Sequence, residues 1–424
     1  MTPRRETALH VLYTRPGESA WYTLDTDHMT FFGANVLEVV RAAGLPGTLL
    51  RRLHFRTVGE EGGVRRTESV WHLHAGEAAG LDWRAEGAWD ERRRAWREVA
   101  RTPPTNVPWM HPGWHADTLA WLDEELTAQG RTRTGEPAVL KHWQISVLWR
   151  VPTGAGPVYL KAVPAFFARE VAVTPVLARE LEGAAPPVLA ADTGRGLLLL
   201  ESAGSEVSEA PDLDAVMAHV ARLQQASRPL LPALELRDRG PEYVLDWLDA
   251  LLSDATLLTG EDGGFTAQDA GALRALRPLL TAALERLAAS PLPRTLGHGD
   301  LHGGNMVARD GAFTLLDWSD VCVTHPFLDV NPAYFSPWQV DPPPGAVDAA
   351  RDVYLRAWTE FAPEDDLKAL FRDAVICGEL YRALGYVDGL QGAVEDKTEW
   401  RTAHLGHLRQ VLRLHRAQDW SWAP

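Results

Sequence analysis

The stretch Leu296–Asp320, LGHGDLHGGNMVARDGAFTLLDWSD, decides how this chain is interpreted. Two strand-like runs, NMVAR and AFTLLDW, flank the dipeptide Asp310-Gly311, which is typical of a tight β-hairpin turn. Such a turn brings Asn305, at the start of the first strand, close to Asp317, at the end of the second. The oxygens of these two side chains could share one hard cation such as Mg²⁺. The sequence therefore predicts a divalent-metal site at the base of a hairpin.

The register of this hairpin limits how the two side chains can meet. With a strict two-residue turn, Asn305 would face Leu316, and Asp317 would point to the opposite face because side chains alternate along a strand. We therefore expect a bulge or a three-residue loop, either of which would turn both side chains to one side.

A third polar side chain lies just before the hairpin. Asp300 lies in HGDLHGGN, where glycines on both sides let the backbone turn sharply and approach a ligand closely. A carboxylate there could accept a proton from a substrate hydroxyl, while a cation at Asn305 and Asp317 screens phosphate charge. One base and two metal ligands form a minimal set for phosphoryl transfer.

The rest of the chain divides into three expected regions. Residues 1–130 mix strand-like runs with helix-like ones and are typical of a small α+β domain. Two alternating apolar runs around TGAGP and two further short apolar runs predict a small β-rich lobe over residues 137–204. Residues 205–424 are mostly helical in pattern, with apolar side chains three and four positions apart. The fold class expected is α+β.

Two details of this pattern can be compared with a structure. Pro175 lies inside the helix-like run AFFAREVAVTPVLAREL and predicts a kink or a break there. The run DAGALRALRPLLTAALERLAAS is periodic throughout and predicts one helix.

Composition excludes several classes of function. A formal net charge of -15 over 424 residues argues against a nucleic-acid-binding role, because phosphate contacts need a basic surface. Cys322 and Cys377 are the only cysteines, which are too few for a disulfide framework and fit a reducing cytoplasm. No run approaches about eighteen apolar residues, and the N-terminus lacks the apolar stretch of a signal peptide. We therefore expect a cytoplasmic protein without a nucleic-acid or membrane partner.

The small lobe should supply a cation for phosphate. Lys161 ends the strand-like run PVYLK, and Glu170 follows nine residues later on the next helix. An ion pair between them could hold the ammonium toward a nucleotide. Taken alone, the two residues are equally typical of a strand-end lysine and a surface glutamate, so their order before Asp300, Asn305 and Asp317 carries the argument.

HGDLHGGN followed by LLDWSD resembles the catalytic and metal-binding motifs of the aminoglycoside phosphotransferase and choline-kinase-like family, whose fold is similar to that of protein kinases. The resemblance implies that Asp300 is the catalytic aspartate and that Asn305 and Asp317 bind Mg²⁺. It also implies that Lys161 holds nucleotide phosphates with Glu170 as its helix partner. It covers the chain from about Pro137 to the C-terminus.

The resemblance assigns further roles. His298 matches the motif histidine that supports the catalytic loop. The run LLLLESAG falls where the family's hinge offers backbone groups to adenine, here Glu201 to Ala203. A departure lies between the first two strands of the small lobe, where a phosphate-covering glycine loop is expected. The sequence there is KHWQISVLW, so Ser146 would have to offer a hydroxyl or backbone N–H to phosphate instead.

The function implied is Mg²⁺-dependent transfer of the γ-phosphate of ATP or GTP to a hydroxyl of a small molecule. Family members of this kind act on antibiotics, sugars, choline-like amines and amino-acid metabolites, so the acceptor stays open. Acidic residues such as Glu379 and Asp388 could face a cationic substrate or simply be solvated surface.

Other interpretations remain at this point. His298, Asp300 and His302 are spaced so that an extended strand would place them on one face, as in a metal-dependent hydrolase. The missing glycine loop is compatible with a non-catalytic, nucleotide-binding pseudokinase. For residues 1–130 a degenerate Nudix-like domain is conceivable, but the glutamate-rich signature is absent, and we assign this region no catalysis.

Overall fold

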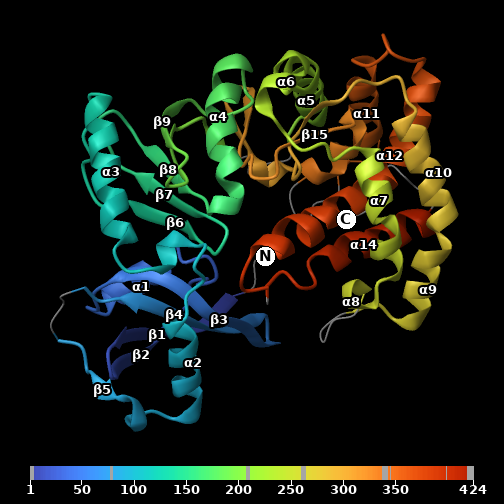
Figure 1. Cartoon of the computed structure of the whole chain (residues 1–424). Coiled ribbons are helices and arrows are strands. Elements are labelled where there is room, and N and C mark those ends of the chain that lie inside the picture. The colour runs from blue at the N-terminus through green and yellow to red at the C-terminus, as the bar shows by residue number, and fades with distance from the viewer. Residues whose placement is uncertain are drawn as a thin grey trace. The chain divides into compact units, whose positions relative to one another are not determined.

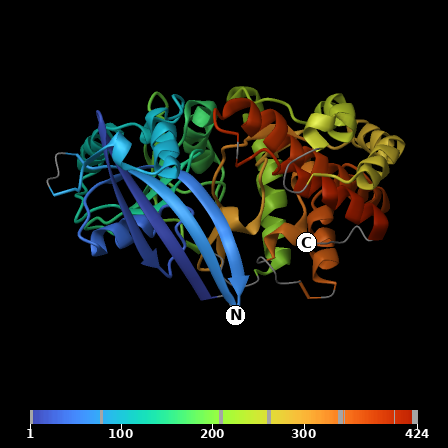
Figure 2. The ribbon, with the colours of Figure 1, turned by 90° about the horizontal axis from the view of Figure 1, so that it is seen from below.

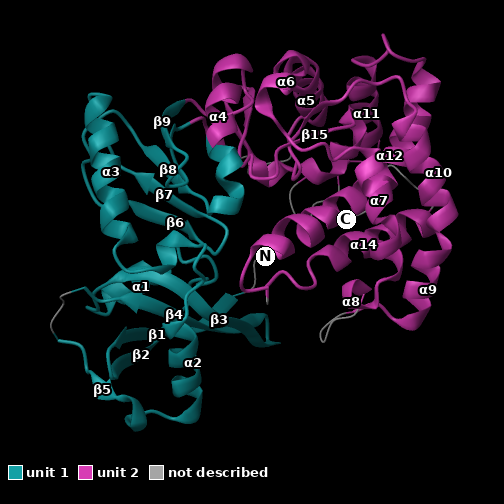
Figure 3. Ribbon diagram, in the orientation of Figure 1, with its two compact units in different colours: residues 1–171, 188–202 teal, residues 172–187, 203–424 magenta. Residues whose placement is uncertain are grey.

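The chain forms two units in the computed structural model (Figure 1), which describes residues 4–76, 80–206, 211–258, 264–336, 342–343, 345–397 and 399–417. The first unit comprises Met1–Val171 and Val188–Ser202, and the second comprises Ala172–Pro187 and Ala203–Pro424 (Figure 3). The N-terminal region and the β-rich lobe thus belong to one unit. A boundary between them near residue 130 stays a prediction.

The N-terminal region is a five-stranded sheet in the order β3-β4-β1-β2-β5, with two helices. Strand β1 runs parallel to β4, while the other neighbours are antiparallel. Figure 2 shows the long strands lying side by side. Their apolar side chains alternate into one core, as a half-buried sheet requires. The elements are β1 (Arg4–Arg15), β2 (Glu18–Thr26), α1 (Val36–Ala42), β3 (Thr48–Glu61), β4 (Val64–His74), β5 (Arg84–Ala85) and α2 (Glu91–Arg101).

The β-rich lobe is a second five-stranded sheet, in the order β6-β7-β8-β10-β9, with all neighbours antiparallel. The hairpin predicted around TGAGP is confirmed, because Val151 pairs with Val158 on either side of it. Inward-facing Trp149 packs with Trp109 and Trp121 beside the sheet. The elements are α3 (Trp114–Ala128), β6 (Ala138–His142), β7 (Val147–Val151), β8 (Val158–Ala162), α4 (Ala168–Glu180), β9 (Val188–Asp192) and β10 (Leu197–Glu201).

Two expected helix breaks and continuities differ in the structure: the break considered at Pro175 is absent, and one expected helix is divided. Helix α4 runs through Pro175 without a break, with Val171 and Leu177 buried on either side of the proline. The single helix expected over DAGALRALRPLLTAALERLAAS is two, because α9 ends at Ala275 and α10 begins at Arg277. Pro278 occupies the first turn of α10, where its missing N–H costs no hydrogen bond, so it starts a helix more readily than it continues one.

The second unit is mainly helical, as predicted, and has one large apolar core. Helices α12 and α14 pack against each other in it (Figure 1). Its longer helices are α5 (Leu213–Ser227), α7 (Pro241–Ser253), α9 (Ala267–Ala275), α10 (Arg277–Ala288), α11 (Ala346–Arg356), α12 (Glu364–Leu384) and α14 (His404–Ala417). The π-helix Gly385–Leu390 continues α12. Short turns of helix are α6 (Leu231–Leu234), α8 (Ala255–Leu258) and α13 (Gln391–Ala393).

Two small sheets lie within this helical unit. Strands β11 (Ser205–Glu206), β13 (Met306–Arg309) and β14 (Ala312–Leu315) form one, and β12 (Thr295–Gly297) pairs with β15 (Cys322–Thr324) in the other. The whole chain is therefore α+β, with the protein-kinase-like order of a β-rich lobe and then a helical lobe, preceded by the α+β N-terminal region. In the part of the chain that the structure describes, no helix has the length and apolar character needed to cross a membrane.

Candidate active site

The hairpin after the loop that carries Asp300 has a strict two-residue turn. Asp310 and Gly311 both adopt left-handed conformations, with φ of 52° and 80°, and Arg309 pairs directly with Ala312. Two successive residues with positive φ match the twist of a β-hairpin, which is why the turn needs no third residue. The expected bulge or three-residue loop is therefore wrong.

Asp317 does not follow the alternation of side chains along β14, because its backbone is not extended. The Leu316 N–H donates to the Asn305 carbonyl at 2.8 Å, as the two-residue turn requires. Asp317, the next residue, has a φ of 61° and so leaves the extended conformation. The alternation rule behind the expected bulge no longer applies at this position. The Ser319 hydroxyl donates to Oδ1 of Asp317 at 2.9 Å and helps to orient the carboxylate.

The catalytic loop begins where β12 ends, and it begins with a backbone position that requires glycine. Gly299 has a φ of 85°, and a Cβ added to it would lie 2.4 Å from the carbonyl oxygen of Asp320. Both the left-handed conformation and this close approach exclude a side chain. The loop before Asp300 is thereby pressed against the segment that follows Asp317.

The side chain of Asp329 fixes the same loop by binding backbone N–H groups of the loop. Its Oδ2 accepts from the His298 N–H at 2.7 Å and its Oδ1 accepts from the Gly299 N–H at 2.9 Å. The carboxylate is almost fully buried. Buried N–H groups require partners, and charged acceptors make the stronger bonds. Our sequence reasoning missed Asp329, because no spacing links it to a loop thirty residues earlier.

His298 lies behind the loop and not in a ligand set. It is 2% exposed, and its Nε2 lies 2.7 Å from the Leu316 carbonyl, so Nε2 carries the proton and donates. Its ring also packs against Trp318, at 4.7 Å between centroids. Burial lowers the pKa of His298, which outweighs the opposing effect of Asp329 and keeps the ring neutral. The histidine thus ties the catalytic loop to the end of the hairpin.

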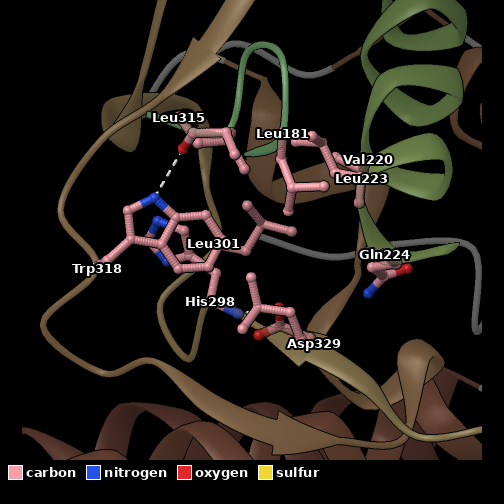
Figure 4. A pocket seen from close by; sticks show the side chains of 11 residues that line it. Leu181, Val220, Leu223, Gln224, His298, Leu301, Leu315, Trp318 and Asp329 are labelled. Carbon is pink, nitrogen blue, oxygen red and sulfur yellow. Dashed lines mark hydrogen bonds between the residues drawn. The ribbon is translucent and has the colours of Figure 1, made fainter. Parts of the chain in front are cut away.

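A small cavity of about 20 Å³ lies behind this histidine (Figure 4). His298 and Asp329 lie close together on one side of it, and leucines such as Leu181 and Leu301 line other parts. The lining is mainly apolar, so the loop rests on packed core and not on solvent. Trp318 anchors the neighbouring segment, because its Nε1–H donates to the Ala184 carbonyl at 2.7 Å.

Asp300 emerges from the supported loop with a half-exposed side chain. His302 lies beside it: its Nδ1 accepts from the Gly304 N–H at 3.0 Å, which leaves the proton on Nε2. That Nε2 lies 3.5 Å from Oδ2 of Asp300. The amide nitrogen of Asn305 donates to the Asp300 carbonyl at 3.0 Å. His302 and Asn305 therefore orient the aspartate from two sides.

Asp300 is ionised at neutral pH. Desolvation alone would raise its pKa, but the hydrogen bond from His302 and the positive charge of Arg382 lower it to about 2. A carboxylate with so low a pKa is a weak base and a good acceptor of a hydroxyl hydrogen bond. It suits a reaction in which positioning matters more than early proton removal.

Arg382, in the last turn of α12, is a second residue that sequence reasoning missed. Its guanidinium donates to the Leu301 carbonyl at 2.9 Å and lies 3.8 Å from Oδ1 of Asp300. The guanidinium also stacks on the Tyr334 ring, 4.4 Å from its centroid. One signal could have found it: an arginine within the apolar run of a helix must have a buried partner.

The β-rich lobe carries the predicted ion pair. Lys161 Nζ, at the end of β8, lies 2.6 Å from Oε1 of Glu170 in the first turn of α4. Both residues are buried, so neither is the strand-end lysine or surface glutamate of the alternative interpretation. Whether the pair meets nucleotide phosphate stays a prediction.

Of the remaining predicted nucleotide contacts, Ser146 and Glu201 belong to the first unit and Ala203 to the second. Ser146 is buried, and its carbonyl accepts from the Trp143 N–H at 2.9 Å, which closes the turn between β6 and β7. Glu201 ends β10 and its carboxylate pairs with Arg131. Ala203 follows two residues later, outside any helix or strand. Their contacts with a nucleotide stay predictions.

Two acidic residues of the helical unit are engaged by neighbouring side chains, and one of them, Glu379, is buried. Glu379 is almost fully buried and accepts from the Tyr334 hydroxyl at 2.7 Å. Asp388 accepts from the Tyr243 hydroxyl at 2.6 Å and pairs with Arg237 at 2.7 Å. Both of the roles considered for Glu379 are therefore wrong, since its carboxylate is used inside the fold.

The hydrolase interpretation finds no support in this geometry. His298 bonds to a backbone carbonyl and His302 to a backbone N–H, which takes up a nitrogen of each ring. Among the residues the structure describes, no group of three or more His, Cys, Asp or Glu side chains is arranged to hold a metal ion. A glycine-flanked carboxylate beside an Asn and Asp pair is instead an arrangement suited to phosphotransferases.

Comparison with known families agrees with that class. The sequence matches the model of APH, the phosphotransferase enzyme family, over residues 146–363, which is more than half of the chain. The protein belongs to this family and is a phosphotransferase by membership. A search of curated proteins found no match.

Several solved structures are similar to this one at low sequence identity. The macrolide 2'-phosphotransferase of Brachybacterium faecium is 19% identical, over 69% of this chain and 98% of that chain, with a TM-score of 0.47. A choline/ethanolamine kinase family protein of Mesorhizobium loti is 16% identical, over 66% and 89%, with a TM-score of 0.46. The Plasmodium vivax ethanolamine kinase is 14% identical, over 67% and 83%, with a TM-score of 0.48.

Proposed function

We propose that this phosphotransferase moves the γ-phosphate of ATP or GTP to a hydroxyl group of a small molecule and requires Mg²⁺. The observation that carries the proposal is the orientation of Asp300, which His302 and Asn305 hold on a loop fixed by Asp329. A rigid, ionised carboxylate on such a loop can align an acceptor hydroxyl for in-line attack.

Asn305 and Asp317 fit a hard divalent cation by the chemistry of their donors. The amide nitrogen of Asn305 is directed at Asp300, so a cation would meet its oxygen, and Asp317 adds a carboxylate oriented by Ser319. Oxygen donors of this kind are those that Mg²⁺ prefers. A bound Mg²⁺ would neutralise charge on the transferred phosphate.

Lys161 would hold nucleotide phosphates, with Glu170 fixing the ammonium through the 2.6 Å ion pair. Glu201 to Ala203 would offer backbone groups to the base, and Ser146 would lie by the phosphates. Two buried, free cysteines agree with work in a reducing cytoplasm. The partners would be a nucleoside triphosphate and a hydroxyl-bearing molecule, without nucleic acid or membrane.

The test is an ATP- and GTP-consumption screen across aminoglycosides, macrolides, amino alcohols and sugars, run with the wild type and Asp300→Ala. We expect one acceptor class to stimulate consumption, and Asp300→Ala to abolish it while MgATP binding changes little. Equal turnover by the two proteins would overturn the assignment of Asp300. Isothermal titration with MgATP provides the second readout.

The glycine-free turn between β6 and β7 favours one competing function, a nucleotide-binding protein without transferase activity. Tight MgATP binding by the wild type, with no phosphorylated product from any acceptor in mass spectrometry, would support that pseudokinase. Phosphorylated acceptor that disappears in Asp300→Ala excludes it.

A further inference from the structure

The turn between β6 and β7, Trp143 to Ser146, lies where the family places its phosphate-covering loop, and it contains no glycine. A glycine loop reaches phosphate with its own N–H groups because its backbone is unhindered. A turn built from Trp, Gln, Ile and Ser lacks that freedom. Its conformation must come from contacts with other parts of the chain, and the N-terminal sheet supplies them.

His142, the last residue of β6, is held by the N-terminal region through two hydrogen bonds, one to the segment between β2 and α1 and one to β3. Its backbone N–H donates to the Phe32 carbonyl at 2.7 Å, and its Nε2 lies 2.9 Å from the Leu50 carbonyl on β3. Burial lowers the pKa of His142 to about 4, so the neutral ring donates one proton to Leu50 at physiological pH. Both bonds cross about a hundred residues of sequence.

Trp143, the first residue of the turn, is enclosed by aromatic rings of the N-terminal region. Its ring makes edge contacts with Phe32, at 5.4 Å, and with Phe31, at 6.4 Å between centroids. Lys141 Nζ lies 4.8 Å from the same ring. Arg52 in turn stacks on Phe31 at 3.8 Å, so the aromatic pair is itself fixed to β3.

The fit around this contact is close. Gly33 has a φ of 82°, and a Cβ added to it would lie 3.0 Å from the Cβ of His142 and 3.0 Å from the Trp71 ring. The backbone after Phe32 therefore lies directly against β6. Val139, also on β6, packs against the cores of both sheets.

We infer that the N-terminal domain positions the β6–β7 turn as a rigid nucleotide-phosphate loop and so determines nucleotide affinity, in place of a flexible glycine loop. The inference rests on the proposed nucleotide site. His142 and Phe32 are positioning residues: they hold the turn without themselves touching the nucleotide. The function of the N-terminal domain would then be to support the nucleotide site.

Two pairs of variants test this in the full-length protein. His142→Phe keeps a ring but loses the bond to Leu50, and His142→Gln restores a donor at similar reach. Phe32→Ala removes a ring that contacts Trp143. Its matched control is Tyr22→Ala, which removes a partly buried ring of the same sheet that contacts Tyr13, at 6.1 Å, and not the turn.

The readouts are the MgATP Kd, KM for MgATP, KM for the acceptor, kcat, and hydrogen exchange of residues 138–151 without nucleotide. His142→Phe and Phe32→Ala should raise Kd and KM for MgATP by about 3- to 10-fold, as expected for one lost contact of about 1 kcal/mol. Exchange in the turn should accelerate, while acceptor KM and kcat stay near wild-type values. His142→Gln and Tyr22→Ala should bind MgATP as the wild type does.

The outcomes separate this inference from the proposed function. If the wild type binds MgATP and the His142→Phe and Phe32→Ala variants bind it equally well, the inference fails and the proposed function stands. If Tyr22→Ala weakens MgATP binding as much as Phe32→Ala does, the effect is general loosening of the domain, and the inference fails again. If the wild type binds no nucleotide, the proposed function and this inference fall together.

Discussion

The carboxylate of Asp329 and the backbone N–H of His298 are joined by a 2.7 Å hydrogen bond across 31 residues of sequence. With the parallel bond to Gly299, this contact makes one buried side chain the support of the loop that ends in Asp300. Because Asp329 binds backbone N–H groups of the loop, the side chain of Asp300 is not needed for this contact.

Asp329→Asn should therefore lower kcat, although residue 329 is buried and lies behind the loop that carries Asp300. The amide offers one acceptor oxygen where the carboxylate offers two, so one buried N–H loses its partner at a cost of about 1–3 kcal/mol in unfolding free energy. We expect kcat to fall while the MgATP Kd changes less. The control is Asp373→Asn, which weakens a two-bond contact with Arg286 on the helical surface. Urea unfolding and steady-state kinetics measure both; equal kcat values in the two variants would contradict the role of Asp329.

His302 should tune Asp300 through its Nε2 proton. His302→Asn keeps an acceptor for the Gly304 N–H, because asparagine caps helical turns well, but removes the donor beside Asp300. The pKa of Asp300 should then rise, because the hydrogen bond from His302 lowers it against desolvation. The acid limb of the pH profile of kcat/KM should move to higher pH. An unchanged acid limb in His302→Asn would show that the histidine only caps the turn.

Asp317 should set the Mg²⁺ dependence. Asp317→Asn removes a charged ligand, and we expect the Mg²⁺ concentration for half-maximal activity to rise by more than about tenfold. Ser319→Ala, which only frees the carboxylate from its 2.9 Å bond, should have a smaller effect in the same direction. Chelation with EDTA should abolish turnover and excess Mg²⁺ should restore it. Activity that persists in EDTA would refute the metal assignment.

Lys161 and Glu170 allow structure and function to be separated. Lys161→Met or Glu170→Gln alone breaks the 2.6 Å buried pair, which should lower the unfolding free energy by about 3–5 kcal/mol. The double variant Lys161→Met/Glu170→Met replaces both charges by apolar groups and should recover much of that loss. It should not recover MgATP binding. Calorimetry and thermal unfolding of the three proteins decide the matter, and a double variant that binds MgATP normally would exclude Lys161 as the phosphate ligand.

His325 should make stability fall in acid. Burial, with a smaller effect of the Arg294 charge, lowers its pKa to about 3 from an ordinary 6.5. The neutral Nδ1 accepts from the Phe327 N–H inside the core. Between about pH 6.5 and pH 3, His325 binds a proton in the unfolded chain but stays neutral in the folded chain. The contribution is thus complete above pH 6.5 and is lost as pH falls toward 3, by up to about 1.4 kcal/mol per pH unit. His325→Asn keeps the acceptor and should flatten this slope in urea unfolding; an identical slope would argue against the neutral histidine.

Much of the helical unit follows from the sequence because its periodicity is strong and local. The hairpin also follows, since a turn dipeptide defines it, and the Lys161–Glu170 pair follows from the order of these two residues before the motif of Asp300. The break between α9 and α10 was missed, because periodicity alone does not record that Pro278 favours a first turn over a helix interior.

The geometry of the site follows less completely. The bulge was a false expectation because strand alternation was applied to Asp317, a residue that has left the strand. Asp329 and Arg382 were missed because their contacts with the catalytic loop span many residues and leave no spacing pattern. The residues proposed to contact a substrate form recognisable sequence motifs. The residues that support those motifs, such as Asp329 and Arg382, can be identified only from their contacts in the structure.

The β13–β14 hairpin divides its sequence into a free end and a constrained end. The residues at its tip, Arg309 to Ala312, are exposed, while Asn305 and Asp317 lie at its base. Asp310 and Gly311 must keep their left-handed conformations for the turn to form, but Ala312 is exposed and carries no such requirement. A fluorescent label at Ala312 should therefore leave the pairing of Met306 with Leu315 intact and report on changes at the base of the hairpin.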